Sequence, residues 1–136
     1  MTERQPKDPR LEKVIDHPLH QYLGITAIQS QEGRGRMAVP VTDNIVNPAG
    51  VLHGGVVYLL CDVCAYAGLL SLLAKGSEAV THDIQVSVMQ AAHKGDILEF
   101  SSAMVKLGKR LGFIDVRMTV DDRVMATARV TKSILP

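Results

Sequence analysis

The sequence is poor in aromatic residues and contains no tryptophan. Only 4% of its 136 residues are aromatic, so it lacks the stacking platforms with which proteins bind single-stranded nucleic acid. The formal net charge is +1, which leaves no excess of basic charge to attract nucleic acid or an anionic membrane surface. We therefore expect neither a nucleic-acid partner nor a membrane partner.

Cysteine is also scarce, because Cys61 and Cys64 are the only two. Their C-x-x-C spacing occurs in redox pairs, but such pairs normally open a helix, where the dipole lowers a thiol pKa. These two fall inside a long apolar run, so we expect buried thiols without a redox role. No further ligands at metal spacing accompany them, and the sequence predicts neither a metal site nor a resident cofactor.

The N-terminus has no apolar stretch, since its first ten residues are MTERQPKDPR. No signal peptide is predicted, and we expect a cytoplasmic protein. The length suits one domain spanning residues 1–136, and 46% of the residues are hydrophobic and available for a core. Residues 1–18 are expected to form a polar extension with a short helix from about Asp8 to His17, ended by Pro18.

The longest apolar run extends from about Gly54 to Ala74 and predicts a helix. Apolar side chains cover every side of its helical wheel, which is typical of a helix that is buried or lies in a membrane. Asp62 lies inside the run, and a charge at the centre of a bilayer costs about 2.5–3.5 kcal/mol. Strand patterns follow the run, so we predict a buried core helix.

The other segments alternate between apolar and polar residues, as strands do. Residues 24–31 and 35–41 predict two strands with a glycine turn between them, and strands are predicted after the helix at about 80–88, 98–104, 114–120 and 124–130. In the first of these later strands, the alternation places Thr81 on the polar face and His82 on the apolar face, where a core histidine is expected. Short links favour antiparallel pairing. The predicted fold class is α+β, with one antiparallel sheet of about six strands and one buried central helix.

The loop before the helix and the first turn of the helix carry the candidate site, with the sequence NPAGVLHGG over residues 47–55. Gly54 and Gly55 fall where the helix begins, where the first amides have no partner within the helix and the dipole is positive. Glycine lets another group approach this backbone closely. Such a helix start suits an oxyanion or a polarised carbonyl; a plain glycine turn is the structural alternative.

Asp62 is the only charged residue between Gly54 and Ala74. A carboxylate is costly to bury without a partner, so this acid is a candidate general base; a structural aspartate bonded to a neighbouring loop is the alternative.

Asp62 follows Gly54 by eight residues, which is about 12 Å along one helix. Both groups therefore cannot reach one reacting carbon within one chain. If both act in one site, they come from two copies of the chain whose helices pack antiparallel across a two-fold axis. A second copy would also cover the part of the apolar helix that one sheet leaves open.

With these residues the sequence resembles the hotdog-fold thioesterases, and within them the PaaI-like acyl-CoA thioesterases of phenylacetate degradation, over about residues 19–133. The signature is N-x-x-G-x-x-H-G-G followed by an acid in the helix, represented here by Asn47, Gly50, His53, Gly54, Gly55 and Asp62. The resemblance implies a curved antiparallel sheet wrapped around one long helix. It also implies a homodimer with two sites at its interface, with a dimer of dimers left open, and hydrolysis of acyl-CoA to a free acid and CoA.

The resemblance assigns roles to four residues. The backbone N–H of Gly54 would polarise the thioester carbonyl, and Asn47 would position the thioester or the water. Asp62 would act as general base or nucleophile. Thr81 matches a serine or threonine that helps to orient the water.

The same resemblance predicts substrate-binding residues outside the reacting centre. His53 and Gly55 are expected there, with His53 supporting the loop through hydrogen bonds. Because CoA carries phosphates, a basic rim is also expected. Lys106, Lys109 and Arg110 lie at a predicted strand turn and are the candidates for it, the alternative being a solvated hairpin tip.

Two other functions remain open at this point. A hotdog hydratase or dehydratase would pair a catalytic histidine with an acid and would lack the H-G-G helix start. A non-catalytic acyl-CoA-binding module would not need a buried acid such as Asp62. An aspartate at this position leans towards the phenylacetate type and away from the glutamate-containing thioesterases that act on naphthoyl-CoA. The acyl group itself is not fixed by the sequence.

Overall fold

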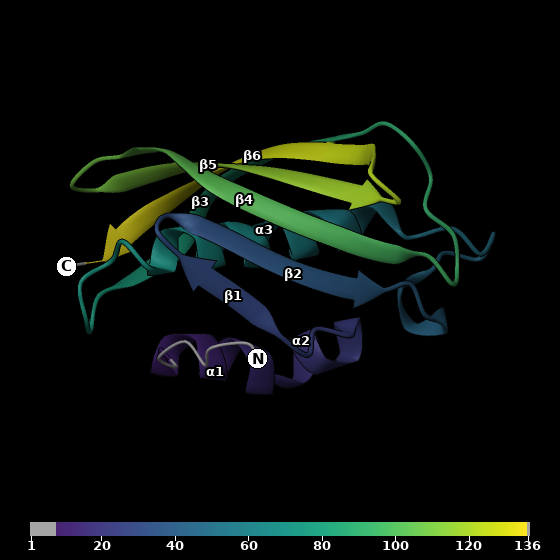
Figure 1. Cartoon of the computed structure of the whole chain (residues 1–136), viewed down its shortest axis with the longest axis horizontal. Helices are drawn as coiled ribbons and strands as arrows, with labels where there is room; N and C mark the ends of the chain where they lie inside the picture. The colour runs from purple at the N-terminus through teal and green to yellow at the C-terminus, as the bar shows by residue number, and fades with distance from the viewer. Residues whose placement is uncertain (1–7, 136) are drawn as a thin grey trace.

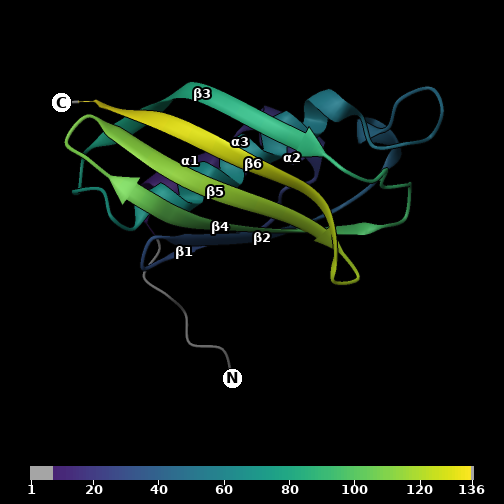
Figure 2. The ribbon, with the colours of Figure 1, turned by 90° about the horizontal axis from the view of Figure 1, so that it is seen from above.

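The computed structural model describes residues 8–135. In chain order the elements are α1 (Pro9–Asp16), α2 (Pro18–Leu23), β1 (Ile28–Gln31), β2 (Arg34–Pro40), the short 3-10 helix η1 (Asp43–Ile45), α3 (Gly54–Leu70), β3 (Glu78–Val88), β4 (Ile97–Leu107), β5 (Leu111–Val120) and β6 (Arg123–Leu135). The strands form one antiparallel sheet in the order β1-β2-β4-β5-β6-β3. Figures 1 and 2 show this sheet curving around α3, with α1 and α2 near its β1 edge. The predicted α+β class is confirmed.

The ends of several elements differ from the prediction. The helix α3 ends at Leu70 and not at Ala74. The first strand begins at Ile28, because Gly24 adopts a left-handed conformation (φ 94°) and ends α2. The helix α2 was not predicted. Pro18 follows the end of α1, as expected, but it also occupies the first position of α2. Proline is well tolerated there because of its missing N–H and fixed φ.

The N-terminal segment holds the end of the core helix. The guanidinium of Arg10 donates to the carbonyl oxygens of Ser77 (2.8 Å) and Ala74 (3.1 Å), and makes longer bonds to the carbonyls of Leu70 and Leu73. Asp8 pairs with Arg10 at 2.9 Å; their hydrogen bond lowers the pKa of Asp8 and raises that of Arg10. A cation beside the free carbonyls at a helix C-terminus is stabilising, so the predicted extension also has a structural role from Asp8 onwards. Its residues 1–7 lie outside the described part of the chain.

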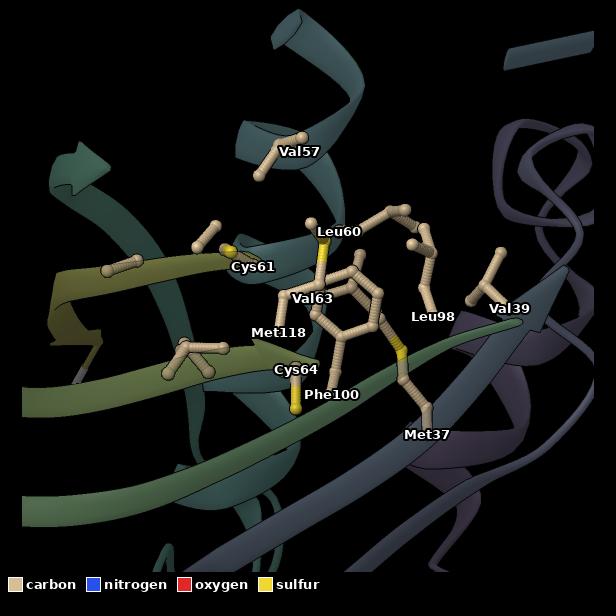
Figure 3. Close-up of a cluster of buried hydrophobic side chains, with 14 of the residues drawn as sticks. Met37, Val39, Val57, Leu60, Cys61, Val63, Cys64, Leu98, Phe100 and Met118 are labelled. Carbon is tan, nitrogen blue, oxygen red and sulfur yellow. The ribbon is translucent and has the colours of Figure 1, made fainter. Parts of the chain in front are cut away.

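The concave face of the sheet packs against α3 to form the core. Figure 3 shows side chains of this helix meeting side chains of β2, β4 and β5, with these residues labelled: Val57, Leu60, Cys61, Val63, Cys64, Met37, Val39, Leu98, Phe100 and Met118. Both cysteines are free and buried. Burial raises the pKa of the Cys61 thiol to about 12 and that of Cys64 to about 11, which confirms the prediction of buried thiols and keeps them protonated near neutral pH.

The helix lies closest to the sheet at Gly35 and Gly68. A Cβ on Gly35 would lie 2.8 Å from the Cys64 carbonyl oxygen, and one on Gly68 would lie 2.5 Å from Ser102 Oγ. Ser102 also donates to the Cys64 carbonyl at 2.6 Å. Glycine, which has no Cβ, fits such a close approach, and these contacts fix the position of α3 against β2 and β4.

Part of α3 is not covered by the described residues of the chain. Tyr58 is 43% exposed and Leu59 is 40% exposed, although the rest of the helix is largely buried. This agrees with the prediction that one sheet covers only part of a helix that is apolar on all sides. Among the described residues, no helix has both the length and the apolar character needed to cross a bilayer.

Candidate active site

The loop before α3 is folded by Asn47. Its Oδ1 atom accepts hydrogen bonds from the backbone N–H groups of Ala49 (2.9 Å) and Val51 (3.1 Å). Its backbone N–H donates to the Val51 carbonyl at 2.7 Å and its carbonyl accepts from Gly50 at 2.9 Å. The side-chain oxygen of Asn47 is therefore used within the loop. Its amide NH2 donates to no residue between 8 and 135, so the NH2 is the part available to a ligand.

His53 caps the N-terminus of α3. Its Nδ1 accepts from the Gly55 N–H at 3.0 Å, and its backbone N–H donates to the Ile45 carbonyl at 2.9 Å. Because Nδ1 is an acceptor here, a neutral imidazole carries its proton on Nε2. The loop-supporting role predicted for His53 agrees with these contacts.

The two glycines at the helix start differ in availability. The Gly55 N–H is used by His53. The Gly54 N–H has no hydrogen-bond partner among the described residues, and a Cβ on Gly54 would meet nothing within 4 Å. A free amide at the positive end of a helix, with open space beside it, can bind a carbonyl oxygen or an oxyanion. Gly54 is thus the glycine with the geometry predicted for carbonyl polarisation.

Asp62, Thr81 and Lys132 form a compact polar group between α3, β3 and β6. The Asp62 Oδ1 atom accepts from Thr81 Oγ1 at 2.8 Å and from Lys132 Nζ at 2.6 Å. Lys132 Nζ also donates to Thr81 Oγ1 at 3.0 Å. No hydrogen bond from residues 8–135 reaches Asp62 Oδ2. The carboxylate, whose side chain is 27% exposed, is therefore paired through one oxygen and open through the other.

The contact between Asp62 and Thr81 depends on an irregularity in β3. The register of β3 against β6 shifts between Thr81 and Asp83, as at a β-bulge, and such a shift exchanges the two faces of a strand. Thr81 consequently faces the helix, together with Ile84 and Val86 beyond the bulge. The prediction that Thr81 lies on the polar face was wrong, because the alternation was extended through the bulge.

His82 lies at this irregularity and was wrongly predicted as a core residue. It is exposed, and its Nδ1 lies 3.4 Å from Ser133 Oγ. The same shift of register explains the error, since the apolar face of β3 continues from Ala79 and Thr81 to Ile84 without His82.

Lys132 is the residue of this group that the sequence reasoning missed. Its side chain is only 5% exposed, and it follows Ala126, Ala128 and Val130 on the face of β6 that packs on the helix. A lysine that continues an apolar face needs a buried negative partner. The position of Lys132 on an apolar face could therefore have indicated its partner, because Asp62 is the only charged residue in the predicted helix.

The aromatic ring of Tyr66 lies one helical turn beyond Asp62. Lys132 Nζ is 5.7 Å from the centroid of this ring, within the range of a cation–π contact. The Tyr66 hydroxyl donates to Glu78 Oε1. Burial and that hydrogen bond raise the pKa of Tyr66, so it stays a neutral neighbour of the lysine.

The predicted basic residues lie away from the loop. Lys109 and Arg110 form the β4–β5 turn and border a hollow with Ser77 and the end of β6, whereas Lys106 lies on β4 opposite Phe113. Figure 1 shows this turn and the loop before α3 at opposite ends of the molecule. Their predicted contact with CoA phosphates stays a prediction.

One chain therefore brings together Asp62 and Thr81, and separately Asn47, His53 and Gly54, but not these two sets. Both sets are attached to the same helix, α3. The eight-residue separation of Gly54 and Asp62 corresponds to about 12 Å, so the distance argument made from the sequence also holds for the structure.

Comparison with known proteins identifies the family. The model of the thioesterase superfamily matches residues 49–127. The Arabidopsis thaliana 1,4-dihydroxy-2-naphthoyl-CoA thioesterase 2 is 32% identical over 136 residues, which cover 93% of this chain and 83% of the plant protein. Human acyl-coenzyme A thioesterase 13 is 28% identical over 110 residues, covering 79% of this chain and 78% of the human protein.

Solved structures share the fold. A mutant thioesterase from Pseudomonas aeruginosa superposes with a TM-score of 0.85 at 18% identity, over 98% of this chain and 96% of that one. A Streptococcus pneumoniae thioesterase solved with coenzyme A gives a TM-score of 0.74 at 24% identity, over 80% and 84% of the two chains. The curved six-stranded sheet around α3 is thus the hotdog fold expected from the resemblance. The chain belongs to the thioesterase superfamily and is, as a member of it, a thioester hydrolase.

Proposed function

We propose that this chain hydrolyses acyl-CoA thioesters to a free acid and CoA, in a site completed by a second copy of the chain. The observation that carries the proposal is the Asp62 carboxylate, which is held through Oδ1 and open at Oδ2. Three comparisons agree with a CoA thioester as substrate. The human and plant relatives are named as acyl-CoA and naphthoyl-CoA thioesterases, and the streptococcal structure contains coenzyme A.

Two features support a second copy as the partner. The first is β3, an eleven-residue strand at the edge of the sheet, since a long edge strand is a ready template for pairing with another chain. The second is a set of exposed apolar side chains beside it, Tyr58 and Leu59 on α3 and Val88 on the helix-facing side of β3. Pairing of two β3 strands about a two-fold axis would join both features in one isologous interface.

Such a dimer would resolve the separation between the two sets of site residues. If the two α3 helices pack antiparallel, Asn47 and Gly54 of one copy lie beside Asp62 and Thr81 of the other. Each interface then contains two equivalent sites. A dimer of two such dimers remains compatible with the sequence and stays a prediction.

The proposed chemistry divides between the two sets. The Gly54 N–H binds the thioester oxygen and stabilises the oxyanion that forms on it, while the Asn47 NH2 holds the substrate. In the base route, Asp62 Oδ2 takes a proton from water as the water attacks the carbonyl carbon. The carbon–sulfur bond then breaks, and the proton passes to the departing CoA thiolate. In the nucleophile route, Oδ2 attacks the carbon itself, CoA leaves, and water hydrolyses the resulting anhydride.

The alternative functions are less well supported. A hydratase of this fold would pair a histidine with the acid, but no histidine among residues 8–135 bonds to Asp62, and His53 is occupied as a helix cap. A simple binding module would not need a carboxylate with one oxygen left open. The lean towards phenylacetate-type substrates stays a prediction, because the plant relative is named for a naphthoyl-CoA.

The direct test is a panel of aryl and aliphatic acyl-CoA thioesters assayed by release of free thiol, comparing the wild type with Asp62→Asn. We expect hydrolysis of at least one thioester by the wild type and loss of it in the variant. Binding without hydrolysis by the wild type would favour the binding module. Undiminished hydrolysis by Asp62→Asn would refute the role of Asp62.

A further inference from the structure

Lys132 stands out among the charged residues because it is almost wholly buried and contacts both predicted reacting groups on its side of the site. Its Nζ atom is 2.6 Å from Asp62 Oδ1 and 3.0 Å from Thr81 Oγ1. The side chain crosses from β6 to the helix and is 5% exposed. No comparison and no sequence motif assigns it a role.

We propose that Lys132 is a positioning residue of the active site, which occupies Asp62 Oδ1 so that Oδ2 is the oxygen that reacts. This inference rests on the proposed function, since it needs Asp62 to act on a thioester or on water. The inference adds that the reactive oxygen of Asp62 is selected by contacts within one chain, before any substrate or second copy is present.

The donors and acceptors of the three residues determine the direction of each hydrogen bond. An ammonium group only donates and an ionised carboxylate only accepts. Thr81 has a single hydroxyl proton, which goes to Asp62 Oδ1, while its oxygen accepts from Lys132. Thr81 therefore has no proton left for a substrate or a water molecule.

This pattern gives Thr81 a more specific role than the one predicted from resemblance. A hydroxyl oxygen has two lone pairs, and Lys132 uses one of them. The other can accept a proton from water while Asp62 Oδ2 accepts the second proton of the same molecule. Such a water has its lone pairs free, which is the orientation required for attack on a carbonyl carbon. Lys132 thus determines which acceptors remain for the water, because it bonds to Asp62 Oδ1 and to one lone pair of Thr81 Oγ1.

The residues around Asp62 and Lys132 determine which control variants the test needs. The other titratable groups nearby are Cys61 and Tyr66 on α3, and Glu78 and His82 on β3. Burial raises the pKa of Cys61 to about 12, and burial with the bond to Glu78 raises the pKa of Tyr66, so neither thiol nor phenol titrates near neutral pH. Glu78 bonds to the Tyr66 hydroxyl and His82 lies near Ser133. Tyr66→Phe and His82→Gln are therefore the matched controls for those two connections.

A structural ion pair is the competing explanation. Asp62 and Lys132 join α3 to β6, and removal of one partner leaves a buried charge unpaired. A purely structural pair predicts that Lys132→Met lowers the melting temperature while the folded fraction keeps the wild-type kcat. A positioning role predicts a change in the folded enzyme itself.

The test compares kcat and KM for the wild type, Lys132→Met and Lys132→Arg, at a temperature where circular dichroism shows all three folded. Met retains the length and packing of the lysine stem without its charge. We expect Lys132→Met to lower kcat by about 10–100-fold, the loss typical of a supporting contact to a reactive group, with little change in KM. Lys132→Arg keeps a cationic donor to Oδ1, so we expect it to recover most of the wild-type kcat.

Several outcomes would overturn the inference. A Lys132→Met enzyme with near wild-type kcat would do so, as would an equal loss of kcat in His82→Gln or Tyr66→Phe. Should Lys132→Met not fold, Lys132→Gln keeps hydrogen-bond donors without the charge and is subject to the same criteria. Failure here is distinct from failure of the proposed function: the latter means that the wild type hydrolyses no thioester, or that Asp62→Asn remains active.

Discussion

The loop at the start of α3 and the polar group at the middle of that helix are built by different kinds of contact. In the loop, Asn47 bonds to residues two and four positions away, and His53 bonds to a residue two positions away. In the polar group, Asp62 bonds to residues 19 and 70 positions away. The loop supplies a neutral backbone donor, and the polar group supplies a carboxylate whose hydrogen bonds come from distant strands. A site divided in this way has one half encoded by a local motif and another half created only by folding.

The largest expected effect is on the charged half. Asp62→Asn removes the proposed base or nucleophile, and we expect kcat to fall by about 10²–10⁴-fold, the range typical of a general base. It also leaves Lys132 as an unpaired buried cation, which lowers the free energy of unfolding by about 3–5 kcal/mol. The two effects are measured by thiol release and by denaturant unfolding.

A double variant separates these two effects. Asp62→Asn combined with Lys132→Met removes both charges, so we expect much of the lost stability to return while activity stays absent. Recovery of activity together with stability would show that Asp62 serves the fold and not the chemistry.

The second largest effect is expected at the backbone donor of the loop half. Gly54→Pro removes the N–H at the first position of α3, where proline is well tolerated, and His53 already has the extended backbone (φ −65°, ψ 129°) that suits the residue before a proline. We expect kcat to fall by about 10²–10³-fold, as when one oxyanion donor is lost, with the helical circular dichroism unchanged.

Gly54→Ala is the matched control for this change, since it keeps the N–H and its Cβ has open space. We expect Gly54→Ala to retain clearly more activity than Gly54→Pro. Equal activity of the two variants would exclude the Gly54 amide as the carbonyl-binding group.

A smaller effect is expected when the two functions of Asn47 are separated. Asn47→Asp keeps the Oδ1 acceptor that folds the loop and removes only the NH2. We expect kcat/KM to fall by roughly five- to tenfold, the worth of about one hydrogen bond, while hydrogen exchange of the Ala49 and Val51 amides stays slow. Asn47→Ala should speed that exchange as well. Fast exchange in both variants would mean that the loop depends on more than Oδ1.

The smallest effect on activity is expected outside both halves, at Arg10. Arg10→Ala removes the cation from the carbonyls at the end of α3 and in the turn that follows it, and we expect unfolding to become easier by about 1–2 kcal/mol with kcat almost unchanged. The partner Asp8 has a lowered pKa in the folded protein. Its stabilising contribution is therefore present above its ordinary pKa of 3.8 and is lost as pH falls through the lower folded value. The acid-unfolding curves of the wild type and Arg10→Ala should converge in that range.

The sequence predicted the fold class, the central helix and the loop half because those depend on periodicity and on neighbours in the chain. Asn47, His53 and Gly54 act within a few residues, so their spacing alone indicates a capped helix start. Thr81 was identified but assigned to the wrong face, since the bulge before Asp83 is a feature of strand pairing and not of composition.

The remainder depended on contacts between distant segments. Lys132 bonds to α3 from the last strand, and Arg10 bonds to the C-terminal carbonyl of α3 from the first helix. The sequence nevertheless contained a sign of the role of Lys132, because this charged residue continues the apolar face of Ala128 and Val130. The sequence contained none for Arg10, because the partners of Arg10 are backbone carbonyls.

The central claim is that each site combines the loop half of one copy with the charged half of another. Its most direct measurement uses heterodimers that contain one Gly54→Pro chain and one Asp62→Asn chain, purified through two different tags, beside the two inactive homodimers. A shared site restores one intact site of the two, so the account predicts about half of the wild-type kcat per dimer. Well-formed heterodimers as inactive as the homodimers would contradict it, because each chain would then hold a complete but damaged site of its own.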